Sequence, residues 1–202
     1  MREDEERLLV ELESLLGGTK LPRIPFPKPF CFDEKRVKAI VLGADPTNTK
    51  ENTQFATVFG IGSGDGRYFR DILSNLKLVG LGLETVYVQN LCRNYFNEET
   101  SKNKLWEKAA KFWIPRLKDE LVKIPADVPV LLTAEIIYKA LMNPGQRIVG
   151  AAECYSGRAT IPIRSETNGL NRPLIPFYRN PTYRLNDPRW DTYRRTLKQI
   201  FS

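Results

Sequence analysis

Three polar residues with side chains that can do chemistry follow short apolar segments of this sequence. Asp45 follows the segment 37–44, Asn90 lies at the end of the segment 84–91, and Asn180 follows the segment 173–179. A carboxylate can stabilise a developing positive charge or orient an attacking water, and an Asn side chain offers both a hydrogen-bond donor and an acceptor. The alternative for each residue is a turn or a cap, because Asp-Pro and Asn-Pro pairs commonly initiate turns.

The 202-residue chain contains no histidine. This excludes Ser-His-Asp and Cys-His mechanisms, imidazole general bases and histidine-ligated metals. Cys31, Cys92 and Cys154 are scattered, with no C-x-x-C pair, so the sequence predicts neither a disulfide framework nor a metal site. Any catalysis is therefore expected to use carboxylates, amides, hydroxyls, Lys, Arg or backbone groups, with no metal or cofactor.

The elements that would position these residues alternate along the chain. Strands are expected at 37–44, 84–91, 128–133 and 173–179, and helices at 3–17, about 67–77, 101–123, from 134 to about 141, and 188–201. Pro115 is expected to kink or split the third helix. The alternation predicts an α/β fold with three α/β/α layers around a four-stranded parallel sheet. The carboxyl ends of parallel strands form one edge, where ligands gather.

The whole chain, residues 1–202, is expected to form a single domain. Residues 1–34 are expected to be an N-terminal helix and a Pro- and Phe-rich connector, and 143–171 an insertion with short strands at RATIPIR. No apolar run approaches the ~20 residues of a membrane span, and the acidic N-terminus lacks an apolar signal region. A cytosolic, monomeric protein without a membrane partner is expected.

The formal net charge is +7, and basic residues are concentrated near the C-terminus. The residues in question are Arg172, Arg179, Arg184, Arg189, Arg194, Arg195 and Lys198. Such a concentration is typical of a protein with a polyanionic partner. A merely solvated surface is the alternative.

Taken together, the motifs resemble those of the uracil-DNA glycosylase superfamily. The sequence GADPT (43–47) is similar to the GQDPY motif that closes strand one, and Phe59 in FATVF matches a Phe about a dozen residues further on. Asn90 in VYVQNL matches an Asn at the end of the next strand, and NPT (180–182) resembles the last motif, HPSP or NPSG. The match runs from about residue 26 to the C-terminus. It implies that family's fold and a monofunctional DNA glycosylase, which hydrolyses the N-glycosidic bond of uracil or a related deaminated or damaged base in duplex or single-stranded DNA.

The resemblance also implies a role for each site residue. Asp45 would stabilise the oxocarbenium-like sugar and orient water, while Asn180 and backbone N–H groups around 44–47 would stabilise the departing base. Ala44, Thr47, Phe59 and Asn90 would bind the base, with Phe59 stacking on it and Asn90 pairing with its edge. Arg179, Thr182, Arg184, Leu185 and Arg189 would contact DNA, Leu185 as a wedge that replaces the extruded base. The alternatives are a core Phe59, a cap at Asn90, a packed loop anchor at Leu185 and solvated arginines.

Two departures from the family pattern leave the excised base open. Asn180 stands where the branch with Asp in its first motif has His, and Thr47 stands where the family has a Tyr beside the 5-position of the base. Two functions of other classes therefore stay open. One is a non-catalytic nucleic-acid-binding domain that keeps the fold and a pocket, and the other is a small-molecule nucleobase or nucleotide binder.

Overall fold

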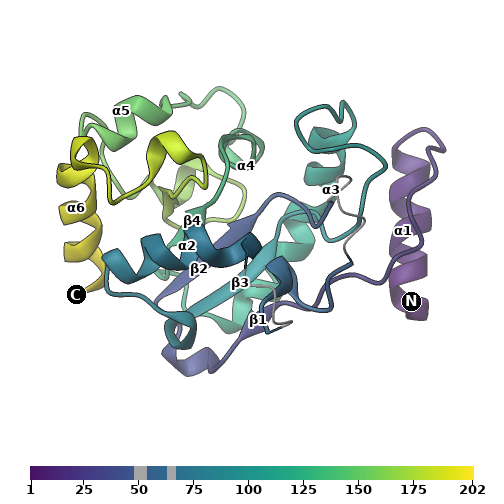
Figure 1. Cartoon of the computed structure of the whole chain (residues 1–202). Helices are drawn as coiled ribbons and strands as arrows, with labels where there is room; N and C mark the ends of the chain where they lie inside the picture. Colours follow the sequence, from purple (N-terminus) through teal and green to yellow (C-terminus); the bar gives the residue numbers. More distant parts are fainter. Residues whose placement is uncertain (48–53, 63–66) are drawn as a thin grey trace.

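The computed structural model of this protein describes residues 1–47, 54–62 and 67–202 (Figure 1). It is a mixed α/β structure built on a five-stranded sheet with the strand order β1-β3-β2-β4-β5. The strands are β1 (Phe30–Cys31), β2 (Ala39–Gly43), β3 (Val86–Asn90), β4 (Val130–Leu132) and β5 (Leu174–Pro176). Strands β2 to β5 run parallel, and β1 pairs antiparallel with β3 at the edge.

The four expected strands are confirmed in position, although each is shorter than expected. The expectation of a four-stranded, wholly parallel sheet is wrong, because the segment expected to be a connector supplies β1, with Phe30 opposite Val88. In β2, Ala39, Ile40, Val41 and Leu42 are fully buried. A strand covered on both faces reads as a continuous apolar run, which is why this strand could be predicted.

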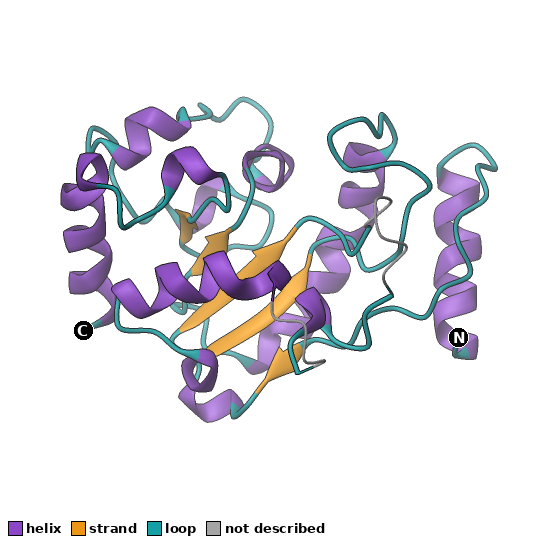
Figure 2. Ribbon diagram, in the orientation of Figure 1, coloured by secondary structure: helices purple, strands orange, loops and turns teal. Residues whose placement is uncertain are grey.

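Six α-helices accompany the sheet in the described part of the chain. They are α1 (Glu3–Leu15), α2 (Arg67–Leu78), α3 (Trp106–Glu120), α4 (Glu135–Leu141), α5 (Ala151–Tyr155) and α6 (Asp191–Phe201). Helix α2 crosses in front of the sheet in Figure 2, and the two termini lie on opposite sides of the molecule in Figure 1. Among the described residues, no helix combines the length and apolar character that crossing a membrane requires.

Two local expectations are wrong. Helix α3 begins at Trp106 rather than at 101, and it continues through Pro115 instead of splitting there. The segment 143–171 contains α5 and turns but no strand, and only an isolated bridge joins Ile163 to Leu174. Pro162, next to this bridge, has no N–H to extend a ladder, so the apolar alternation of RATIPIR does not produce a strand.

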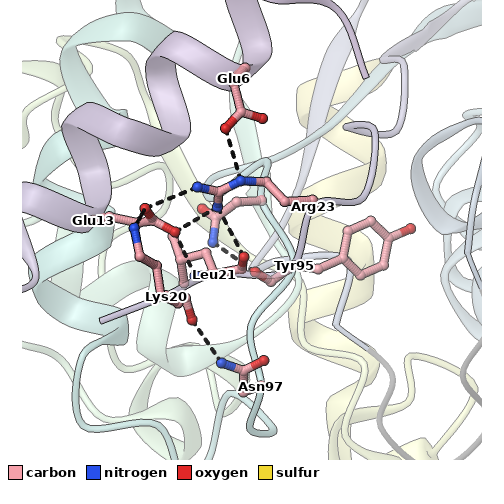
Figure 3. Close-up of polar contacts among 8 residues, drawn as sticks. Glu6, Glu13, Lys20, Leu21, Arg23, Tyr95 and Asn97 are labelled. Atoms are coloured by element: carbon pink, nitrogen blue, oxygen red, sulfur yellow. Dashed lines mark hydrogen bonds and ion pairs between the residues drawn. The ribbon is translucent and has the colours of Figure 1, made fainter. Parts of the chain in front are cut away.

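Helix α1 is joined to the rest of the molecule through a buried carboxylate (Figure 3). Glu13 is 3% exposed, and it accepts hydrogen bonds from Leu21 N at 2.8 Å, from Lys20 Nζ at 3.0 Å and from two nitrogens of Arg23. Glu6, about two turns earlier on the same face of the helix, also pairs with Arg23 at 2.9 Å. The Asn97 side chain donates to the Lys20 carbonyl at 2.9 Å. This polar network connects α1 to the segment that precedes α3.

Candidate active site

The ends of β2 and β3 bring Gly43 and Asn90 next to each other, because the two residues are register partners in the parallel ladder. The ladder continues beyond the strands: Leu91 N donates to the Gly43 carbonyl at 2.8 Å, and Cys92 N donates to the Ala44 carbonyl at 2.9 Å. The chain therefore leaves the sheet only at Asp45. This places the first predicted motif at the carboxyl edge of the sheet, where ligands of parallel sheets bind.

Gly43 allows two predicted base-binding side chains to approach the backbone of β2. A Cβ atom at this position would lie 2.2 Å from Asn90 Oδ1 and 2.6 Å from Phe59 Cζ, which is closer than real contacts allow. Phe59 has φ of 58°, a conformation that is uncommon for a residue with a side chain. Its ring is partly buried and lies 5.6 Å from the ring of Phe69. The structure thus brings Phe59 and Asn90 together beside Gly43.

Asn90 is buried, with 3% of its surface exposed, and its Oδ1 has no hydrogen-bond partner among the described residues. Its backbone N–H donates to Gln89 Oε1 at 2.9 Å, and Gln89 Nε2 in turn donates to Glu120 at 2.9 Å. Tyr87 also donates to Glu120, and Arg93 forms an ion pair with it. The free oxygen lies at the end of a fixed polar network. An unpaired buried acceptor is costly, and a ligand N–H directed at it would remove that cost.

The carboxylate of Asp45 is held by donors from two segments of the chain. Its Oδ1 accepts from Thr47 N at 2.8 Å, and its Oδ2 accepts from Thr100 Oγ1 at 2.5 Å and from Trp106 Nε1 at 2.9 Å. Burial raises the pKa of this carboxyl group, although the hydrogen bonds from Thr100, Thr47 and Trp106 act in the opposite direction. Each carboxylate oxygen has two acceptor positions, and in the described part of the chain Oδ1 uses one of them, for Thr47 N.

The sequence motifs pointed to neither Thr100 nor Trp106. Trp106 is fully buried, but its indole N–H reaches a carboxylate 61 positions earlier in the chain. No periodicity or local motif signals a contact of this kind. The one available sequence signal was the aromatic residue at the start of a helix, and this also fits packing.

Thr47 and Ala44 lie on either side of Asp45, and each is hydrogen-bonded to the chain that follows β3. The hydroxyl of Thr47 accepts from Phe96 N at 2.9 Å, which ties the turn to the β3–α3 segment. Ala44 is partly buried and contributes its carbonyl to the extended ladder. Asp45 with Thr47 N also forms the turn that an Asp-Pro pair suggests. The turn at Asp45–Thr47 is therefore itself part of the candidate site.

Asn180 forms the turn that an Asn-Pro pair suggests. Its Oδ1 accepts from Thr182 N at 2.9 Å and so caps the short 3-10 helix Pro181–Tyr183. Both Asn180 and Thr182 are exposed. Within the described ranges, no hydrogen bond joins Asn180 to Asp45 or Asn90. Asn180 instead lines a separate pocket of about 420 Å³ beyond the ends of β4 and β5.

The predicted DNA-contacting side chains differ in their freedom to bind phosphate. Arg184 pairs with Asp71 at 3.3 Å, and Arg189 pairs with Asp187 at 2.6 Å. Arg179 is exposed and has no ion pair with an acidic side chain in the described ranges. Leu185 is fully buried, and its backbone N–H is bound by Asn75 at 3.1 Å. The packed-anchor alternative therefore describes Leu185, and the wedge does not.

Other basic residues near the C-terminus are also neutralised or buried. Arg172 is 5% exposed and donates to the carbonyls of Leu121, Ile124 and Pro125. Arg194 and Arg195 both pair with Asp191. Much of the basic sequence signal thus serves internal structure. Within the described chain, no group of three or more His, Cys, Asp or Glu side chains is placed to hold a metal ion.

Comparison of the sequence with protein-family models and with curated proteins gives no match.

Proposed function

We propose that this protein is a monofunctional DNA glycosylase, which hydrolyses the N-glycosidic bond of uracil or a related deaminated or damaged base. The observation that carries the proposal is the buried Oδ1 of Asn90, which has no hydrogen-bond partner among the described residues and lies close to Phe59 and to the turn that bears Asp45. The order of the sequence motifs gives further support. The proposal includes the three-layer, uracil-DNA glycosylase-like arrangement of the sheet and helices.

Asn90 would read the edge of an extruded base. Uracil has an N–H at ring position 3, whereas cytosine has an unprotonated acceptor nitrogen there. An acceptor oxygen in the protein therefore favours uracil, since cytosine would leave two acceptors facing each other. Phe59 would supply a ring for stacking, in the way that base-flipping enzymes hold an extruded base.

Asp45 would assist the loss of the base. As the C1′–N bond breaks, its electron pair leaves with the base and positive charge develops on the sugar, which a nearby carboxylate stabilises. The second acceptor position of Oδ1 would orient a water whose oxygen bonds to C1′, and the released proton would pass to Asp45 or to the departing base. The products are the free base and an abasic site. We infer that the protein does this as a monomer in the cytosol without a metal or cofactor.

The test is a panel of single-stranded and duplex oligonucleotides, each with one modified base, incubated with the protein and then cleaved with alkali. We expect strand cleavage at uracil or at another base with an N–H at the equivalent position. Release of none of the bases in the panel would contradict the proposal.

A non-catalytic nucleic-acid-binding domain is the second candidate, and a specific observation favours it. All three donors around Asp45 come from the protein itself, and Asn180 caps a turn rather than approaching Asp45. A carboxylate used only to hold loops would show the same contacts. Binding of uracil-containing DNA without base release would support this candidate.

A further inference from the structure

A pocket opens beyond the ends of β4 and β5, and β2 lies between these strands and β3, which carries Asn90. It has a volume of about 420 Å³, within the range of small-ligand pockets, and six of its lining residues are Thr133, Glu135, Tyr178, Arg179, Asn180 and Tyr183. None of Asp45, Phe59 and Asn90 lines it. Thr133 Oγ1 donates to the Leu42 carbonyl at 2.9 Å, immediately before Gly43. The two sites therefore lie next to each other along the same sheet edge.

One wall of this pocket is aromatic and rigidly supported. The partly exposed ring of Tyr183 lies 4.7 Å from the ring of Tyr155 and 5.7 Å from that of Trp190. Trp190 Nε1 also donates to the Thr182 carbonyl at 2.8 Å, which fixes the loop. Tyr178, another lining residue, has a buried hydroxyl with no hydrogen-bond partner among the described residues. An aromatic ring held in place can stack on a ligand ring at little entropic cost.

The polar groups of the pocket suit a ring joined to an anion. Asn180 uses its Oδ1 in the turn, so its amide N–H groups remain available to a carbonyl or ring nitrogen. Arg179 is exposed without an acidic partner in the described ranges, and its backbone N–H is fixed to the Thr133 carbonyl at 2.9 Å. An aromatic wall, an amide donor and a free guanidinium together match a base and its phosphate.

We propose that this pocket binds the nucleotide next to the reactive one in the same DNA strand, with its base against Tyr183 and its phosphate at Arg179. The inference rests on the proposed function, since it takes the Asn90 site as the site of the reactive nucleotide. Strands β3 and β4 are two strand spacings apart, about 10 Å, so one nucleic-acid strand can reach both sites. The affinity of the protein for a DNA strand should therefore depend on whether a base is present at one of the two positions next to the reactive nucleotide.

The experiment uses single-stranded oligonucleotides with one uracil, in which the neighbouring base on the 5′ or the 3′ side is replaced by a tetrahydrofuran spacer. Dissociation constants are measured by fluorescence anisotropy for wild type, Tyr183→Ala, Arg179→Gln and the matched control Arg147→Gln, whose exposed arginine pairs with Glu153 and does not line this pocket. We expect one of the two spacers to weaken wild-type binding about tenfold. Tyr183→Ala should bind the intact strand about tenfold more weakly and lose its sensitivity to that spacer.

Wild-type protein provides a second readout that does not depend on a variant folding. Trp106 and Trp113 are buried, whereas Trp190 is partly exposed and adjacent to Tyr183, so binding in the pocket should change the tryptophan fluorescence. Equal affinity for the intact strand and both spacers would overturn the proposal, as would a Tyr183→Ala protein that keeps the wild-type spacer effect. Uracil release without a spacer effect would reject this pocket alone. A spacer effect without release of any base would reject the glycosylase and retain the pocket.

Discussion

The carboxylate of Asp45 is coupled to two segments of the chain, its own turn through Thr47 and the β3–α3 segment through Thr100 and Trp106. Thr100 and Trp106, the two donors from the β3–α3 segment, both bond to Oδ2 rather than to Oδ1. Thr100 and Trp106 therefore act on any reaction at this site through Asp45. They are positioning residues in the proposed mechanism.

Replacing Thr100 by Val should change the pH dependence of base release. The Thr100 hydrogen bond lowers the pKa of Asp45, so its loss raises that pKa further. If the reaction needs the carboxylate, its rate falls as the pH falls through this pKa, and the acid limb of the single-turnover rate should move to higher pH in the variant.

The matched control is Thr196→Val, which removes an exposed hydroxyl that bonds only to the Thr192 carbonyl. An acid limb at the same pH in wild type and Thr100→Val would show that Asp45 does not set the profile.

Replacing Gly43 by Ala should displace Asn90 and Phe59, because the new Cβ would lie 2.2 Å from Asn90 Oδ1. We expect a loss of about 1–3 kcal/mol in the free energy of unfolding, together with weaker binding of uracil-containing DNA. Gly150→Ala is the control, since nothing lies within 4 Å of a Cβ there. Denaturant unfolding and anisotropy measure the two effects. Equal values for Gly43→Ala and Gly150→Ala would contradict the close packing described above.

Asp45 and Asn90 could be predicted from the sequence, whereas Thr100 and Trp106 could not, and the reason is physical. Asp45 and Asn90 could be placed together because parallel strands share one carboxyl edge, and this edge is fixed by the apolar runs before them. The contacts of Asp45 with Thr100 and Trp106 depend on how the β3–α3 segment folds back, and local patterns do not encode that path. Likewise, the pairing of Arg184 with Asp71 joins segments 113 positions apart.

At the scale of elements, helix α1 is held by the buried Leu9 and Leu12 and by one buried carboxylate, that of Glu13. Arg23 and the Leu21 N–H hold the pKa of Glu13 at about 2, compared with 4.5 for a free Glu, despite the opposing effect of burial. A carboxyl group whose pKa is lowered on folding stabilises the folded state above its unfolded pKa. That contribution is lost as the pH falls from about 4.5 toward about 2.

Glu13→Gln should therefore lower the free energy of unfolding at pH 7 by about 2 kcal/mol and flatten the loss of stability between pH 4.5 and 2. Glu11→Gln is the matched control on the same helix, because Glu11 forms a half-exposed pair with Arg116 at 2.9 Å and should contribute much less. Denaturant unfolding at a series of pH values measures both. An equal effect of the two substitutions would mean that the network around Glu13 does not anchor α1.

The elements that the sequence missed are those with little length or little pattern. Strand β1 has two residues, too few to show any alternation, and its pairing with β3 is a tertiary contact. Helix α5 has five residues inside a segment whose apolar alternation suggested strands. The long helices and the four parallel strands were found because each buries a continuous or periodic apolar set.

At the scale of the whole molecule, the concentration of arginines near the C-terminus overstates the positive surface that a polyanion could reach there. Arg184, Arg189, Arg194 and Arg195 all have acidic partners, and Arg172 is buried against carbonyl groups. Arg179 differs from these arginines, because it is exposed and has no acidic partner among the described residues. A few unpaired side chains, rather than the basic C-terminal sequence as a whole, should therefore determine the electrostatic part of binding.

Arg179→Gln should reduce the dependence of duplex binding on salt by about 0.9 in the slope of log affinity against log salt concentration, the value for one lost phosphate contact. Arg189→Gln should change the slope by much less, because Asp187 already neutralises this arginine. Affinities measured from low to moderate salt give the slopes. An unchanged slope for Arg179→Gln would place the phosphate contacts elsewhere on the surface.

The central claim, that the site at Asp45 and Asn90 breaks an N-glycosidic bond, is tested most directly by the single-turnover rate of uracil release by Asp45→Asn. Asp33→Asn is the matched control, since Asp33 accepts from the N–H two residues later, as Asp45 does, but lies beside the 3-10 helix Glu34–Arg36. The N–H₂ group of an Asn at position 45 would face one of the donors that bind Asp45. We therefore expect Asp45→Asn to lose about 1–2 kcal/mol in the free energy of unfolding while remaining folded. Its rate should fall by at least about 10²-fold at saturating protein, with Asp33→Asn at the wild-type rate. Equal rates for wild type and a folded Asp45→Asn protein would contradict the account.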